Sequence, residues 1–86
     1  MFTYVYVLQS LKDGEWYIGK TKDLRKRFNE HMTKKSFATA SRGPWRLMFY
    51  EAYLDPEDAT RREHYLKTTE GHRALRLMLR NYLAAK

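Results

Sequence analysis

The sequence predicts a small α/β protein of the α+β type, with its elements in the order ββαβαα. Two β-type segments near the start are joined by an Asp-Gly turn, which is typical of a hairpin. A third, aromatic-rich β-type segment follows a helical one, and the last third of the chain has the start and stop signals of helices. If the first strand is central, both other strands run antiparallel to it, in a three-stranded antiparallel sheet flanked by helices.

Residues 2–10 form the first predicted strand, because aromatic and β-branched side chains alternate on both of its faces, as in an interior strand. The segment 12–15 provides the turn, and residues 16–20 form the second strand. Gly19 lies near the end of that strand, where we expect a bulge or a close approach to the backbone. Residues 45–54 form the third strand.

The first helix begins after Asp23, whose side chain can cap its N-terminus. Leu24, Phe28 and Met32 repeat at helical spacing and predict a buried stripe. Residues 33–44 then form a long loop-like segment.

The second helix has the clearest start in the chain, since Asp55 can act as N-cap and Pro56 suits the first helical position. We expect it to run to about Thr69 and to end at Gly71. A last helix is expected over residues 73–83.

The length predicts one domain, residues 1–86, because a chain of this size builds a single small core. Its 17 Lys and Arg residues against 10 Asp and Glu give a net charge of +7. A polyanionic partner is the simplest explanation of this charge. Nucleic acid is favoured over an acidic membrane, since no basic amphipathic helix stands alone.

The chain contains no Cys, which excludes disulfides, thiolate metal sites and a cysteine nucleophile. This composition fits a reducing compartment, and we expect a cytoplasmic protein. The first ten residues lack the features of a signal peptide, and no segment approaches the roughly 20 apolar residues of a membrane span. No membrane association is expected.

Several side chains suit the hydrolysis of a phosphodiester, which requires an activated water, a cation on the phosphate oxygens and stabilisation of the leaving oxyanion. Glu63 could hold one hydrated Mg²⁺ or Mn²⁺, because Mg²⁺ keeps several waters and needs few protein ligands. Arg27 offers a bidentate fork for phosphate. A tyrosine hydroxyl beside cations could lose its proton below its usual pKa of about 10 and act as a base.

Two tyrosine-centred motifs lie one hairpin apart, and basic and acidic residues follow them at regular spacing. The segments that carry the pattern are Tyr4-Val5-Tyr6, Tyr17-Ile18-Gly19, Lys20, Asp23-Leu24, Arg27, His31 and Glu63. Over roughly residues 2–80 this pattern resembles the GIY-YIG nuclease family, in its compact single-domain bacterial form. The resemblance implies a three-stranded antiparallel sheet and a metal-dependent endonuclease that hydrolyses DNA by a one-metal mechanism. It also implies one Mg²⁺ or Mn²⁺ ion as cofactor.

The resemblance implies five catalytic residues. Tyr6 corresponds to the tyrosine of the first motif, and Tyr17 to that of the second. Arg27 corresponds to the catalytic arginine, and His31 to a histidine that many members carry one turn later. Glu63 corresponds to the metal ligand.

Two departures from the family pattern stand out. The glycine that gives the first motif its name is Tyr4 here. Some members use an asparagine downstream of the metal glutamate, and the sole downstream candidate here is Asn81. A role for a downstream amide is therefore open.

Each catalytic candidate also has a structural alternative. The two tyrosines could be half-buried aromatics of the core. Arg27 could be a solvated residue of a basic run, and His31 a satisfied helix histidine. Glu63 could merely pair with Lys67, four residues on.

Seven further basic residues are candidate nucleic-acid contacts: Lys20, Lys22, Arg25, Lys26, Lys34, Lys35 and Arg42. The expected partner is DNA, with RNA as an alternative. Such contacts to phosphates position a substrate but do not read its sequence. The preferred target could be a branched, nicked or single-stranded DNA structure, or a site that a partner protein presents. Such a nuclease would act in DNA repair or recombination. The alternative function is a non-catalytic, basic nucleic-acid-binding module that retains the nuclease fold; a third is a small structural protein.

Overall fold

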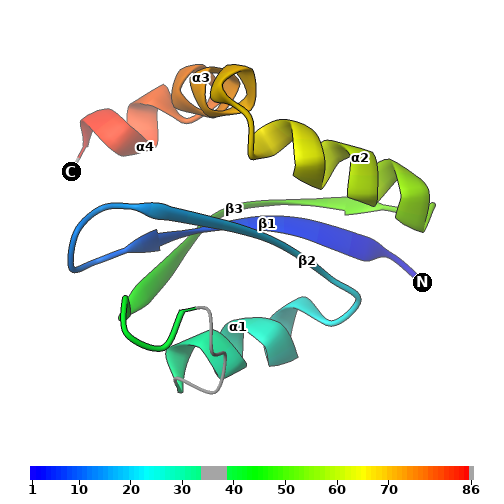
Figure 1. Ribbon diagram of the computed structural model, residues 1–86, viewed down its shortest axis with the longest axis horizontal. Coiled ribbons are helices and arrows are strands. Elements are labelled where there is room, and N and C mark those ends of the chain that lie inside the picture. The colour runs from blue at the N-terminus through cyan, green and yellow to red at the C-terminus, as the bar shows by residue number, and fades with distance from the viewer. Residues whose placement is uncertain (34–38, 86) are drawn as a thin grey trace.

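The computed structural model describes residues 1–33 and 39–85, which form three layers (Figure 1). A sheet lies in the middle, with one helix against one face and the C-terminal helices against the other. The strands and helices are β1 (Thr3–Ser10), β2 (Trp16–Thr21), α1 (Leu24–Met32), β3 (Trp45–Tyr53), α2 (Pro56–Leu66), α3 (Thr69–Met78) and α4 (Arg80–Ala84).

The sheet has the order β2-β1-β3, and β1 pairs antiparallel with both neighbours. The predicted antiparallel sheet with a central first strand is therefore confirmed. Tyr6 of β1 lies opposite Gly19 of β2 and Tyr50 of β3. The register between β1 and β3 shifts between Val7 and Leu8.

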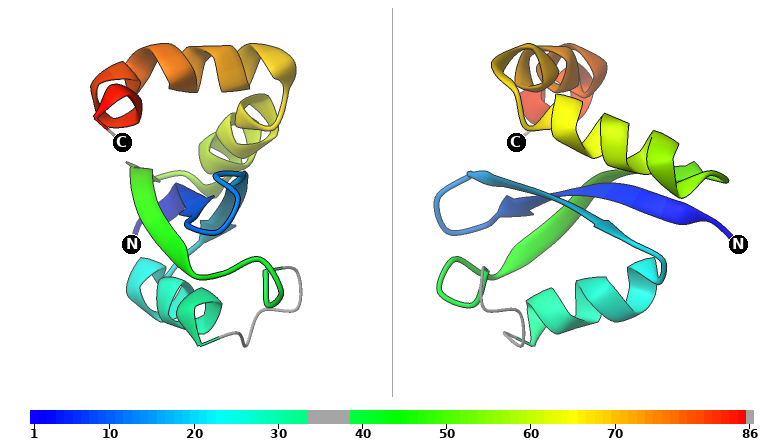
Figure 2. Two further views of the ribbon diagram at one scale, coloured as in Figure 1. Left: turned by 90° about the vertical axis from the view of Figure 1, so that its left-hand side faces the viewer. Right: turned by 45° about the vertical axis from the view of Figure 1, so that its right-hand side comes forward.

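Two small cores lie on the two faces of the sheet, and they explain why β1 is apolar on both sides. On one face, α1 covers a cluster formed by Tyr6, Leu8 and Trp45. On the other face, α2 and α3 cover a cluster that includes Val5 and Val7 (Figure 2). Alternate residues of a strand point to opposite faces, so the central strand contributes to both cores.

The two predicted helix starts are confirmed by their capping geometry. The carboxylate of Asp23 accepts a hydrogen bond from the backbone N–H of Lys26 at 3.0 Å. The carboxylate of Asp55 accepts from the backbone N–H of Glu57 at 2.8 Å, with Pro56 at the first helical position. Both carboxylates thus satisfy a backbone donor in the first turn of their helix.

The C-terminal third differs from the prediction at Gly71, which does not end a helix. α2 ends at Leu66, and Thr68 caps α3 by accepting from the backbone N–H of Gly71 at 3.0 Å. A Cβ at Gly71 would collide with the carbonyl of Tyr65, so glycine permits the close approach of two helices. The expected last helix is divided at Leu79 into α3 and α4.

The predicted buried stripe of α1 is wrong at Met32, whose side chain is exposed. Leu24 and Phe28 do pack against the sheet, but the fully buried residue of this helix is His31. The buried side of α1 is thus rotated toward His31, and a histidine takes the place expected for an apolar side chain. No helix in residues 1–33 or 39–85 is long and apolar enough to cross a membrane.

Candidate functional site

A chain of buried hydrogen bonds joins β1 to α1 and to the segment before β3. The Tyr6 hydroxyl lies 2.9 Å from Nε2 of His31, and Nδ1 of His31 lies 2.7 Å from Oγ1 of Thr39. The indole N–H of Trp45 donates to the carbonyl of Thr39 at 3.1 Å. All four side chains are buried, so this chain fixes the position of the Tyr6 hydroxyl in the core.

Arg27 brings its guanidinium to both tyrosines of the predicted site. It donates to the Glu30 carboxylate at 2.9 Å, and it also hydrogen-bonds the hydroxyls of Tyr6 and Tyr17. The bond to Glu30, followed by the bond to Tyr6, raises the pKa of Arg27, which keeps it charged. A third of its side chain stays exposed, 33%. Arg27 is therefore held against the site rather than free in solvent, and a ligand can still reach it.

These partners assign the proton positions in the buried chain. A guanidinium can only donate, so the Tyr6 oxygen accepts from Arg27 and its own O–H is left to donate to Nε2 of His31. Neutral His31 then carries its proton on Nδ1 and donates it to Thr39. His31 thus holds the Tyr6 hydroxyl through a fixed tautomer.

Tyr17 lies beside this chain and is only partly buried. Its ring centroid is 5.1 Å from that of His31 and 6.4 Å from that of Tyr6. The Tyr6 ring lies directly over Gly19, where a Cβ would collide with the Tyr6 hydroxyl. The strand pairs regularly through Gly19, so there is no bulge at this position. Glycine is needed because the Tyr6 side chain, rather than another backbone, comes close to it.

Burial gives His31 a pH-dependent effect on stability. Burial, followed by the charge of Arg27, lowers the pKa of His31 to about 4 from an ordinary value of 6.5. Between these two values the unfolded chain binds a proton at His31 that the folded chain does not. The free energy of unfolding should therefore fall by roughly 3 kcal/mol as the pH drops from 6.5 to 4, and stay level for this group above 6.5.

Urea unfolding at several pH values between 7.5 and 4 checks this prediction. Carboxylates also titrate at the acid end, so the quantity to compare is the pH slope of each variant against the wild type. His31→Gln should remove the His31 share of the slope. His64→Gln, a change at an exposed histidine, should keep it. Equal slopes for the wild type and His31→Gln would show that His31 has the same pKa in the folded and the unfolded chain, and would contradict its burial in the neutral form.

Glu63 lies on α2, across the sheet from α1, with its side chain 13% exposed. Its Oε2 lies 3.2 Å from Nζ of Lys67, so the ion pair raised as the structural alternative is present. Glu63 also acts on Tyr6. Burial raises the pKa of Tyr6 most, Arg27 opposes this, and the charges of Tyr17 and Glu63 raise the pKa further. The charge of Glu63 is the weakest of these influences on the pKa of Tyr6.

The described residues could hold a divalent cation only as a hydrated ion with few protein ligands. Within residues 1–33 and 39–85, no group of three or more His, Cys, Asp or Glu side chains could hold a metal. A hydrated Mg²⁺ or Mn²⁺ needs only one or two carboxylates, and Glu63 can supply one. Its charge is balanced by Lys67, whose side chain is half exposed and can leave. Glu63 is thus suited to a single-ligand, water-rich ion.

The basic residues predicted to bind nucleic acid do not form one surface. Lys22, Arg25 and Lys26 lie together, exposed, around the start of α1. Lys20 donates to Oγ1 of Thr60 on α2 at 2.8 Å.

Arg42 lies near the opposite end of β1, where its carbonyl accepts from Ser10 and its guanidinium covers the Trp45 ring at 5.1 Å. This cation–π contact holds the Arg42 side chain against Trp45, and its role as a phosphate contact stays a prediction. Lys34 and Lys35 lie outside the described residues.

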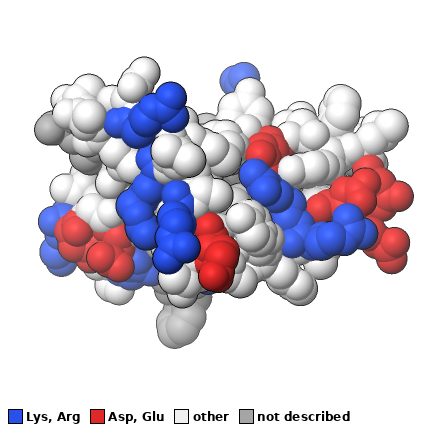
Figure 3. Space-filling view, turned by 90° about the horizontal axis from the view of Figure 1, so that it is seen from above, with Lys and Arg blue, Asp and Glu red and all other residues white. Residues whose placement is uncertain are grey.

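The face formed by α2, α3 and α4 carries interspersed charges of both signs rather than a basic surface (Figure 3). The acids at the start of α2 and the ion pair of Arg61 with Asp58, at 3.0 Å, contribute to this mixture. The cations around the start of α1 are therefore the better candidates for contacts with phosphates.

The sequence did not indicate the residues that support the site. Thr39 lies in a segment without periodicity, so nothing marked it as the partner of His31. Glu30 stands three residues after Arg27, a helical spacing that could have predicted their ion pair. Thr60 approaches Lys20 only through the packing of α2 on β2.

The chain is similar in sequence to known bacterial proteins. A UPF0213 protein of Halalkalibacterium halodurans is 42% identical over 65 residues, which cover 74% of this chain and 68% of that protein. A UPF0213 protein of Clostridium perfringens is 34% identical over 76 residues, which cover 87% of this chain and 81% of that protein.

The solution NMR structure of a UPF0213 protein from Bacillus halodurans has the same fold. It matches with a TM-score of 0.58 and 36% identity, covering 91% of this chain and 85% of that one. The GIY-YIG catalytic domain family matches residues 2–76, which is most of the chain. The resemblance inferred from the two tyrosine motifs is confirmed, and the chain belongs to the GIY-YIG catalytic domain family.

Proposed function

We propose that this chain is a metal-dependent endonuclease that hydrolyses phosphodiester bonds in DNA. One observation carries the proposal: Arg27 from α1 bonds the hydroxyls of Tyr6 and Tyr17 from two strands, while Glu63 from the opposite layer acts on the same Tyr6. Core packing alone gives no reason for Arg27 to contact both tyrosines, and Glu63 adds a carboxylate whose charge is felt at Tyr6. A centre for phosphodiester cleavage requires a cation, a base and a carboxylate together.

In this proposal, Arg27 binds the phosphate of the substrate. The guanidinium has five N–H donors, so it can bind a phosphate oxygen while it keeps its bonds to the tyrosines and exchanges Glu30 for the substrate. The phosphate would then lie next to both tyrosine hydroxyls, either of which could take a proton from the attacking water. His31 is a positioning residue, because it is buried, neutral and bonded to Tyr6.

Glu63 would hold Mg²⁺ or Mn²⁺, which when bound supplies positive charge to the phosphate oxygens. The raised pKa of Tyr6 keeps it protonated at neutral pH. Neutralising Glu63 removes one of the charges that raise this pKa, while Arg27 continues to lower it. The neutralised Glu63 and the charged Arg27 together favour loss of the Tyr6 proton.

The alternative function is a basic nucleic-acid-binding module without activity. Such a module needs the cations around the start of α1 but has no use for Tyr6, Tyr17 and Glu63 around Arg27. A role in DNA repair or recombination, and a partner protein that selects the target, are further parts of the proposal. The partner protein is proposed because the described residues form one small sheet with its helices, whose contacts to phosphates would position DNA but not select a sequence.

Titration of Mg²⁺ and of Mn²⁺ against labelled linear, branched and single-stranded DNA tests the proposal. We expect cleavage of at least one substrate that rises with the metal concentration and stops on addition of EDTA. Binding of every substrate without cleavage, at any concentration of either metal, would favour the non-catalytic module.

Binding to duplex DNA should weaken steeply with salt. If about five phosphates are neutralised by basic residues such as Lys22 and Arg25, the logarithm of the binding constant should fall with a slope of about −4.5 against the logarithm of the salt concentration. Fluorescence anisotropy measured from about 50 to about 200 mM salt, where affinity changes strongly, gives the slope. An affinity independent of salt would contradict a phosphate-binding role.

A further inference from the structure

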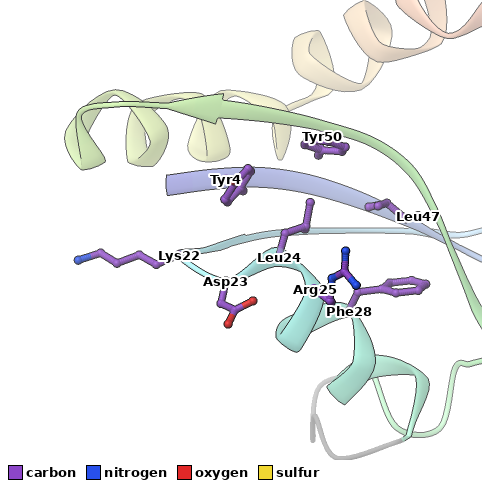
Figure 4. A pocket seen from close by; sticks show the side chains of 8 residues that line it. All are labelled: Tyr4, Lys22, Asp23, Leu24, Arg25, Phe28, Leu47 and Tyr50. Atoms are coloured by element: carbon purple, nitrogen blue, oxygen red, sulfur yellow. The ribbon is translucent and has the colours of Figure 1, made fainter. Parts of the chain in front are cut away.

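A groove between α1 and the β1–β3 half of the sheet has no part in the proposed reaction (Figure 4). The groove is open to solvent and has a volume of about 510 Å³, within the usual range of small-ligand sites. Three aromatic rings line it, and two cations lie at its rim: Tyr4, Phe28, Tyr50, Lys22 and Arg25. The groove thus combines flat apolar surfaces with positive charge.

The aromatic lining presents exposed ring surface to a ligand. Tyr50 is 53% exposed, although it lies on a strand that packs against a helix. The Tyr4 and Tyr50 rings meet edge to face, with centroids 6.0 Å apart and planes at 61°, so they do not cover each other's faces. Tyr4 also stands where the first family motif has its glycine, so one wall of the groove comes from this chain's departure from that motif.

The rim of the groove is positive despite Asp23. The Asp23 carboxylate accepts from the backbone N–H of Lys26 as the cap of α1, and its single negative charge is outnumbered by the positive charges of Lys22 and Arg25. In the part of the chain that the structure describes, no salt bridge involves Lys22, Arg25 or Lys26. These cations are therefore available to an anionic ligand.

We propose that this groove binds an unpaired nucleotide of DNA, with the base against Tyr50 and Tyr4 and the flanking phosphates at Lys22 and Arg25. Stacking on aromatic rings beside a cationic track is how proteins bind single strands without reading sequence. A base inside a duplex cannot present its face in this way. The inference rests on the proposed nuclease function and narrows its substrate to DNA with a single-stranded segment beside the cleaved bond.

The groove and the candidate active site are neighbours. Phe28 of the groove directly follows Arg27 in α1, and successive side chains of a helix point about 100° apart, so one helix turn contributes to both sites. Tyr4 and Tyr6 lie on the same face of β1, two residues apart, which is roughly 6.6 Å along a strand. A strand with its phosphate at Arg27 could therefore place an adjacent base in the groove.

Fluorescence anisotropy in EDTA tests this inference without cleavage, with one labelled oligonucleotide used as a single strand and as a duplex. Tyr50→Ala should weaken binding of the single strand by about 5- to 150-fold, the range found for loss of one stacking partner. Binding of the duplex should change little. Tyr50→Phe keeps the ring and should retain the affinity for the single strand.

Matched controls come from the opposite layer. Tyr65→Ala removes a 40% exposed tyrosine of α2 and should leave single-strand binding unchanged. Arg25→Ala should reduce the salt slope for the single strand by about 0.7, the loss of one phosphate contact. Arg61→Ala, at an exposed arginine of the opposite layer that pairs with Asp58, should not.

The inference is overturned if Tyr50→Ala binds the single strand as tightly as the wild type, or if it weakens single strand and duplex equally. Because these measurements need no catalysis, the groove can fail while metal-dependent cleavage persists. Conversely, a protein that never cleaves DNA but loses single-strand affinity in Tyr50→Ala would disprove the nuclease and keep the groove. The two proposals therefore fail separately.

Discussion

Glu63→Gln is expected to slow metal-dependent DNA cleavage by about 10³-fold or more while leaving folding and DNA binding largely intact. The amide has the shape of the carboxylate but lacks the charge that would hold a divalent cation. Charge stabilisation by such a cation is worth several kcal/mol, and about 1.4 kcal/mol corresponds to a tenfold change in rate. The single-turnover rate at saturating Mg²⁺ or Mn²⁺ measures the effect.

Two controls separate this role from the ion pair with Lys67. Lys67→Gln breaks the same pair but keeps the carboxylate, so cleavage should persist. Glu57→Gln removes an equal charge from the exposed first turn of α2 and should also keep cleavage. If Glu63 serves only as the partner of Lys67, Glu63→Gln would cost about 0.5 kcal/mol of stability or less and leave the rate unchanged. That result would end the proposed role of Glu63.

Arg27→Ala should lower the cleavage rate by at least about 10²-fold and also weaken DNA binding, because it removes both a transition-state contact and a phosphate contact. A second effect acts in the same direction. Arg27 opposes the burial that raises the pKa of Tyr6, so its loss leaves the Tyr6 proton harder to remove. Single-turnover rates and anisotropy measured on the same substrate separate the two contributions.

Conservative and distant changes sharpen the Arg27 prediction. Arg27→Lys keeps the charge but loses the planar fork that reaches Glu30 and both tyrosines, so we expect it to restore binding better than cleavage. Arg61→Ala removes an equally basic residue from the outer surface of α2 and should leave the cleavage rate unchanged. Full activity in Arg27→Ala would mean that Arg27 serves only to hold Tyr6 and Tyr17.

The sequence predicted the elements well where local signals are strong. Asp55-Pro56 marked the start of α2, and the apolar character of residues 2–10 on both faces marked a central strand. It failed at Gly71, because a glycine that ends a helix and one that allows two helices to touch look alike in sequence. It also failed at Met32, since periodicity alone does not show that a buried histidine can take the apolar place.

The candidate site was predicted by resemblance rather than by local pattern. Tyr6, Tyr17 and Arg27 lie in separate elements, so their meeting depends on tertiary packing that periodicity does not contain. The pairing of His31 with Thr39 depends on how the chain returns from α1 to β3. The stacking of Arg42 on Trp45 likewise follows from that return.

The most direct test of a single site built from four elements is the paramagnetic effect of Mn²⁺ on the NMR spectrum of the wild-type protein and of Glu63→Gln. Mn²⁺ should broaden the amide signals around Glu63 and, across the sheet, those near Tyr6 and Gly19. The same additions should leave these signals sharp in Glu63→Gln. Broadening confined to the exposed acids at the start of α2, and equal in both proteins, would contradict a metal-dependent site at Glu63 and Tyr6.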